Sequence, residues 1–501
     1  MSIDQSSVRH TEPNHESGLV SVSRTDAANT PSSTSTQRED ASLHSAAWRR
    51  DELQQELRTL IFKTAATAAP TRQCTPDGLA ANQDGVSALV SPLSGNIHDS
   101  EQQTVEYMLC QGRNAEYLAN YISEIAPWLD MFDSHRAFGI QVPLLARSTP
   151  ALMYAMLALS ARHLERKAAS SANQSVTGNS RPRSSGSLDS LELYQEAIRL
   201  VGPLLEVRDF RVVPICTILC VMEMMSVSAQ GWRQHLEGCA ALFDAFGVHG
   251  FSGQLSQAVF WCYARMDLCG ALISDGTQST LVPLSRWAPS VAIDNAQDVA
   301  GLFCASKDPD MHANYAVYLC SKVCDLIASR TQFVELGNEN GCDDSEYTAR
   351  WLCLWTELQR WTDERPVDIL PIQVVEASES SPFPHVLFLH WAAISSTQLY
   401  HTACLLLLGM LPLAEQCHLP RGQVGSQVYH AKRICGISQT NPHQGCLNNA
   451  IQPLWLAGRL LSHPVEHKIV VELIRDIEAT TGWGTSWRIP DLEVAWGFRA
   501  E

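Results

Sequence analysis

The sequence predicts an all-α protein, a multi-helix array preceded by a disordered N-terminal arm. Three observations lead to this prediction. Apolar residues recur at every third or fourth position over long stretches, as they do on one face of a helix. Alternating runs of Val, Ile and Thr, which would indicate strands, are absent. Helix boundaries are marked by the start signal Ser148-Thr149-Pro150 and by Gly247, which closes the helix that begins near Trp232.

The N-terminal arm is expected to span residues 1–100. Residues 1–45 are rich in Ser, Thr, Asp and Asn and lack apolar periodicity, which is typical of disordered segments. A short amphipathic helix is expected near residues 48–63, with its apolar side formed by Trp48, Leu53, Leu57, Leu60 and Ile61. Residues 64–100 return to Ala, Thr, Pro and Gly, the composition of a linker.

The helical body is expected to span residues 101–501. Its clearest periodic sets are Leu152/Met156/Leu159, Leu191/Tyr194/Ile198/Val201, Trp232/Leu236/Cys239/Phe243/Phe246, Val259/Cys262/Met266/Cys269/Ile273 and Ile469/Leu473/Ile477. Residues 168–187 are rich in Ser, Asn and Arg and are expected to form a mobile insertion between two helices. Irregular structure is expected at residues 291–310 and 421–442.

The charge balance argues against direct DNA binding. The formal net charge is -17, and the basic runs are short, so the phosphate backbone would repel the chain as a whole. The two most apolar stretches, residues 212–225 and 386–413, contain polar side chains such as Glu223 and His401, which suit buried helices better than membrane spans. The first residues lack the apolar core of a secretory signal, so we expect an intracellular protein without membrane contact.

No catalytic, cofactor or metal site is predicted. The sequence contains no phosphate-binding glycine loop, nucleophile elbow or H-E-x-x-H motif. The sixteen cysteines include no C-x-x-C pair, so we expect reduced thiols packed as small apolar groups. His463 and His467 have the spacing of a helical metal pair, but Pro464 is expected at the first helical position, which leaves His463 outside the helix.

Eight residues, seven in two sequence blocks and one that follows them, are singled out as candidates for a structural role. They are Trp232, His235, Leu236, Phe260, Trp261, Arg265, Asp267 and Trp287. The aromatic members are expected in the core; the alternative is a cavity that binds a small effector. Arg265 and Asp267 are two positions apart on a helix and cannot neutralise each other, so we expect at least one to pair with an opposite charge from another helix. The alternative is that one of them faces water.

The order of several sequence blocks resembles the fungal-specific transcription factor domain. The blocks are 149–164, 232–239 (WRQHLEGC), 260–267 (FWCYARMD), 283–287 (PLSRW), 381–384, 398–407, 452–459, 467–473 and 481–487, and they cover about residues 105–500. The resemblance implies an all-helical regulatory body, location in the nucleus and control of transcription. The eight candidate residues correspond to structural positions of the family blocks.

Typical members of this family also carry an N-terminal six-cysteine zinc cluster that binds DNA. Cys74 is the only cysteine before position 100, so we expect a regulator that acts without its own zinc cluster, or one whose cluster lies on an upstream exon. The expected function is nuclear regulation or co-regulation of transcription, with a secondary-metabolite gene cluster as target. The expected partners are other transcription factors or co-regulators, including a DNA-binding relative, in a homo- or heterodimer. The alternative is an enzyme of a fungal biosynthetic pathway with an unrecognised helical fold.

Overall fold

The computed structural model describes residues 34–68, 95–174, 189–226, 232–274, 277–289, 296–415 and 422–498. The helices are α1 (Thr34–Ala68), α2 (Gly95–Leu109), α3 (Asn114–Asn120), α4 (Ala126–Leu129), α5 (Val142–Ala146), α6 (Pro150–Gln174), α7 (Asp189–Glu206), α8 (Val212–Ser226), α9 (Trp232–Phe246), α10 (Gln254–Ile273), α11 (Ala296–Ala305), α12 (Pro309–Leu336), α13 (Asp344–Asp363), α14 (Trp391–Gly409), α15 (Gln427–Thr440), α16 (Gln444–Gly458), α17 (Pro464–Thr481) and α18 (Arg488–Ala495). Short π-helical and 3₁₀ segments are η2 (Tyr121–Ile125), η3 (Ala137–Gln141), η5 (Leu284–Arg286), η7 (Val367–Ile369), η8 (Leu413–Glu415) and η9 (Gln423–Gly425).

The predicted all-α fold is confirmed. The strands found in the described ranges are β1 (Gln373–Val375) and β2 (His385–Leu387), which pair antiparallel with Val374 opposite Val386. This small hairpin has too little alternating sequence to be recognised, because each strand has three residues. Within the described residues, none of the helices is both long enough and apolar enough to cross a membrane.

Several predicted boundaries are wrong. Helix α1 begins at Thr34 and ends at Ala68, well outside the expected 48–63, and α6 continues to Gln174, inside the expected insertion. The rest of that insertion, residues 175–187, lies outside the described residues, as do residues 1–33 and 69–94 of the expected arm. Helix α11 occupies part of the segment expected to be irregular at 291–310.

The prediction of irregular structure at residues 421–442 is also wrong, because helix α15 occupies most of this segment. The Ser426 side chain accepts a hydrogen bond from the backbone N–H of Tyr429, which satisfies a free donor at the start of the helix. The residues that α15 buries are His430, Ala431, Ile434, Cys435, Gly436, Ile437 and Ser438. The histidine and serine in this set interrupt the apolar pattern, which is why the sequence did not predict a helix here.

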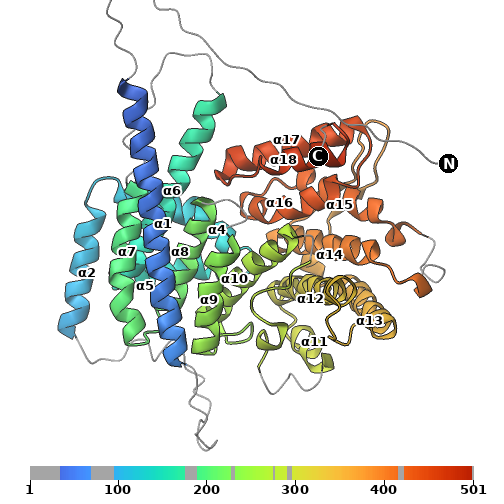
Figure 1. The fold of residues 1–501 in the computed structure, drawn as a ribbon, viewed down its shortest axis with the longest axis horizontal. Helices are drawn as coiled ribbons and strands as arrows, with labels where there is room; N and C mark the ends of the chain where they lie inside the picture. The colour runs from blue at the N-terminus through green and yellow to red at the C-terminus, as the bar shows by residue number, and fades with distance from the viewer. Residues whose placement is uncertain are drawn as a thin grey trace, which may run out of the picture. The chain divides into compact units, whose positions relative to one another are not determined.

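The chain divides into two units, residues 1–48 and 49–501. In the first, the described residues belong to the beginning of α1. The second unit contains two groups of helices. In one group, α6 packs on α7 and α8, and α8 packs on α9. In the other group, on the opposite side of Figure 1, α12 packs on α13 and α14, α14 on α15, α15 on α16, and α16 on α17. Helix α10 contacts α8, α9, α12 and α16, and so joins the two groups. The residues that α10 presents therefore lie where the groups meet.

Candidate functional site

Helix α10 carries an aromatic cluster that fixes two loops. The rings of Phe260, Trp261 and Trp287 lie edge to face, with centroids 5.4–5.7 Å apart. Trp261 donates its indole N–H to Gly250 O at 2.8 Å, and Trp287 donates its own to Val282 O at 3.0 Å. Gly250 and Val282 belong to the loops that precede and follow α10. The cluster thus places three of the candidate residues together in the core.

The charged pair of α10 is buried without the expected ion pair. Arg265 is 6% exposed; it donates to Leu129 O at 2.7 Å and lies 5.2 Å from the Phe132 ring. Asp267 is 1% exposed and accepts from the backbone N–H groups of Leu281 and Val282 at 2.8 and 3.0 Å. Neither forms an ion pair with any residue in the described ranges.

The prediction of a salt bridge from another helix was therefore wrong: both groups form hydrogen bonds to the backbone instead, Arg265 to Leu129 O and Asp267 to two N–H groups. Burial raises the pKa of Asp267 to about 6, and the two backbone N–H donors act against that shift by stabilising the carboxylate. The Asp267 side chain ties the loop after α10 to the helix.

The three remaining candidates lie at the beginning of α9. Leu236 is buried, and its carbonyl accepts a hydrogen bond from the Tyr263 hydroxyl of α10 at 3.1 Å. Trp232 and His235 are helical in backbone, but their side chains lie outside the described residues. The structure thus joins α9 to α10 through Leu236 and leaves the roles of Trp232 and His235 as predictions.

A cavity of about 80 Å³ adjoins Arg265, between α8, α10 and α16. Its walls are mostly apolar, with Val221, Met224, Cys262, Cys269 and Ile451 among them. Three polar atoms on its lining have no hydrogen-bond partner within the described part of the chain: Trp128 Nε1, Asn448 Oδ1 and Asn449 Nδ2. A buried polar atom without a partner is costly, so these atoms and the Arg265 guanidinium favour a bound polar group or water.

Sequence reasoning missed Trp128, Asn448 and Asn449. The signal that could have found the asparagines is their position within an otherwise apolar helix, where two adjacent amides require partners. Trp128 follows Pro127 in the short helix α4 and carries no comparable signal.

A second buried polar feature, the histidine pair, lies between α14 and α15. His401 Nδ1 and His430 Nδ1 are 2.8 Å apart, and His430 Nε2 lies 2.9 Å from Val424 O. Since a carbonyl only accepts, His430 Nε2 is the donor there, and its Nδ1 accepts the proton of His401 Nδ1. Burial lowers the pKa of His430 to about 4 and holds that of His401 well below its usual value, so both rings are neutral at pH 7.

The histidine pair should make folding stability depend on pH. Because their pKa values are depressed in the fold, the unfolded chain binds more protons as the pH falls from about 6.5 to about 4, and stability is lost over that window. Each histidine adds a slope of up to about 1.4 kcal/mol per pH unit. We expect the double variant His401→Gln, His430→Gln to show a shallower pH dependence than wild type in urea unfolding at pH 7, 6 and 5. Equal slopes would contradict this assignment, since other titrating groups are common to both proteins.

The two spaced histidines at the start of α17 have separate contacts. His463 is the N-cap residue, with Nδ1 accepting from Val465 N at 3.2 Å, and Pro464 is the first helical residue, as predicted. The ring of His467 stacks on Trp496 with centroids 4.0 Å apart. The two rings are therefore engaged separately.

Comparison with known proteins gives a consistent result. The model of the fungal specific transcription factor domain matches residues 116–492. Transcription activator AMTR1 of Alternaria alternata is 24% identical over 343 residues, which cover 56% of this chain and 43% of that protein. The matched region thus spans less than half the length of this relative. No solved structure matches the chain.

Proposed function

The chain belongs to the fungal-specific transcription factor domain family, and we propose that it acts in the nucleus as a transcriptional regulator or co-regulator. The family match over residues 116–492 is the observation that supports this most strongly, because it includes nearly all of the helical body. The similarity to a transcription activator agrees with it. The target we propose is a set of secondary-metabolite genes.

We propose that DNA contact comes through a partner, namely a DNA-binding relative or co-regulator, in a homo- or heterodimer. The net charge of -17 supports this, because phosphate repulsion opposes binding by an acidic body. The helical body then supplies protein contacts. Purified chain that shifts promoter DNA at physiological salt, without any partner, would contradict this part of the proposal.

The test of the regulatory function is a deletion strain analysed for transcripts and metabolites together. We expect coordinated changes in a set of genes, with the tagged protein recruited to their promoters. Unchanged transcripts and one accumulated intermediate would instead favour the alternative, an enzyme of a biosynthetic pathway. The neutral His401–His430 pair does not favour catalysis, because three of its four ring nitrogens are occupied, by each other and by Val424 O.

A second function is supported by the cavity beside Arg265: we propose that it binds a small acidic metabolite as an effector. The guanidinium provides a fixed positive charge, and Trp128 Nε1 and Asn449 Nδ2 provide two unused donors. Because the cavity lies between α8, α10 and α16, a ligand there would contact helices from both groups of the body.

We expect Arg265→Met to weaken effector binding at least about ten-fold, since one charge-assisted hydrogen bond is lost. The measurement is affinity selection of small carboxylic acids from cell extract, followed by titration calorimetry. Arg330→Met is a matched control, because Arg330 also donates to a backbone carbonyl, Cys342 O at 2.8 Å, and lies 4.9 Å from the Tyr347 ring, but it does not line the cavity. Equal binding by the two variants would exclude this cavity as the effector site.

A further inference from the structure

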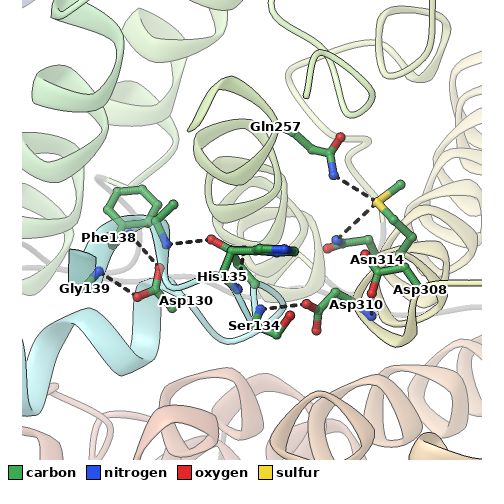
Figure 2. Close-up of polar contacts among 12 residues, drawn as sticks. Asp130, Ser134, His135, Phe138, Gly139, Gln257, Asp308, Asp310 and Asn314 are labelled. Carbon is green, nitrogen blue, oxygen red and sulfur yellow. Dashed lines mark hydrogen bonds and ion pairs between the residues drawn. The ribbon is translucent and has the colours of Figure 1, made fainter. Parts of the chain in front are cut away.

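A cluster of possible metal ligands lies beside α10, at a second cavity whose walls include Trp261. The turn that follows α4 carries Asp133 and His135, and the first turn of α12 carries Asp310. Figure 2 shows His135 and Asp310 near each other. One ligand atom from each of the three lies within 4.8 Å of the others. They line a cavity of about 200 Å³, together with Asp308 and Asn314. Three potential ligands from two distant segments are thus brought to one point.

Asp310 is buried with one oxygen unused. The residue is only 5% exposed, and its Oδ2 accepts a hydrogen bond from Ser134 N at 2.6 Å. Oδ1 is buried and has no hydrogen-bond partner among the described residues. One turn along α12, Asn314 is 1% exposed, and its Oδ1 also lacks a partner there. Buried acceptor oxygens without donors require a partner, and a bound cation would supply one.

The local charge supports the same conclusion. Asp133 and Asp310 approach each other, yet neither forms an ion pair with Lys or Arg among the residues described. Two close carboxylates repel each other unless a cation lies between them.

The ligands are also held in place by the backbone. Asp133 Oδ2 accepts from Ala137 N at 2.8 Å, and its Oδ1 accepts from His135 N at 3.1 Å. Arg136 adopts a left-handed conformation, φ 55°, which turns the chain so that these donors converge. At α12, Asp308 caps the helix by accepting from Asp310 N at 3.0 Å. Such hydrogen bonds orient ligands in metal sites without occupying all their lone pairs.

We propose that Asp133, His135 and Asp310 bind a divalent cation that joins the turn after α4 to the start of α12. Two carboxylates and one imidazole suit Mn²⁺ or Zn²⁺ better than a soft ion such as Cu⁺. Ligand distances of about 2.0–2.2 Å would require only a small contraction of the cluster. The turn also contains Phe132, whose ring faces Arg265, so the cation would stabilise the segment that supports that residue.

Binding of Mn²⁺ to the full chain, followed by electron paramagnetic resonance, tests this proposal. Mn²⁺ is the chosen probe because the many thiols of this chain compete poorly for it. We expect one tight site per chain, from which Zn²⁺ displaces Mn²⁺ and Mg²⁺ does so more weakly. Asp310→Asn should weaken binding about ten-fold or more.

Two further variants complete the test. His135→Gln changes a side chain that is 79% exposed, so folding should be retained while Mn²⁺ affinity falls. Asp343→Asn is the charge-matched control. Asp343 also lies at the start of a helix, where it accepts a hydrogen bond from Ser345 N, but it lies outside the cluster. We therefore expect this variant to bind Mn²⁺ with unchanged affinity. Absence of Mn²⁺ binding to the wild type, or equal affinities for all four proteins, would overturn the proposal.

Discussion

Replacing Gly436 with Ala should destabilise the protein by about 3 kcal/mol, the upper end for overpacking a filled core. Gly436 lies inside α15, where an alanine would ordinarily increase stability by about 1 kcal/mol through its helix propensity. The added Cβ would, however, lie far inside van der Waals contact of Pro384 O, a backbone atom just before β2. A backbone oxygen cannot turn aside as a flexible side chain can, so the helix and the hairpin must separate.

The matched control is Gly301→Ala. Gly301 is an exposed residue inside α11, and an added Cβ would meet nothing within 4 Å. This variant should gain up to about 1 kcal/mol. Urea unfolding measures the change in the free energy of unfolding of each variant relative to wild type. We expect this change to be a loss for Gly436→Ala and a gain for Gly301→Ala. If Gly436→Ala were also stabilising, the close contact of α15 with the hairpin would be wrong.

The contrast between α10 and α15 shows what the sequence can predict. Helix α10 has an apolar set at regular spacing, and its position and core aromatic residues followed from that pattern. Helix α15 buries His430, Gly436 and Ser438 through contacts with the hairpin and α14. These contacts cannot be predicted from the local spacing of apolar residues. Tertiary contacts, rather than helix propensity, determine this element.

The sites were harder to predict than the fold. Asp133 and Asp310 are near in space but belong to segments that are far apart in the chain, and neither has a recognisable spacing motif. The same holds for Trp128 and Asn449, which meet at the cavity beside Arg265. The backbone partners of Arg265 and Asp267 were equally hidden, because a sequence shows which side chains carry charge but not which carbonyl or N–H group will face them.

Replacing Trp261 with Ala should have the largest effect of the variants considered, about 4 kcal/mol of lost stability, because a fully buried indole is removed and Gly250 O loses its donor. The more specific test uses Trp261→Phe with Gly250→Ala. A Cβ at Gly250 would lie 2.5 Å from Trp261 Cζ2 and 3.1 Å from Trp287 O. Gly250→Ala alone should therefore cost about 2–3 kcal/mol.

Phenylalanine at position 261 lacks the atoms that the new methyl group would strike, so the double variant should be more stable than the sum of its single variants predicts. We expect a coupling energy of at least about 1 kcal/mol, measured by urea unfolding of all four proteins. The control cycle pairs Gly250→Ala with Trp361→Phe, since Trp361 is an equally buried tryptophan that donates instead to His312 O at 2.9 Å. That cycle should be additive within about 0.5 kcal/mol. Additivity in both cycles would mean that Gly250 does not lie against Trp261, and that the loop before α10 is held by other contacts.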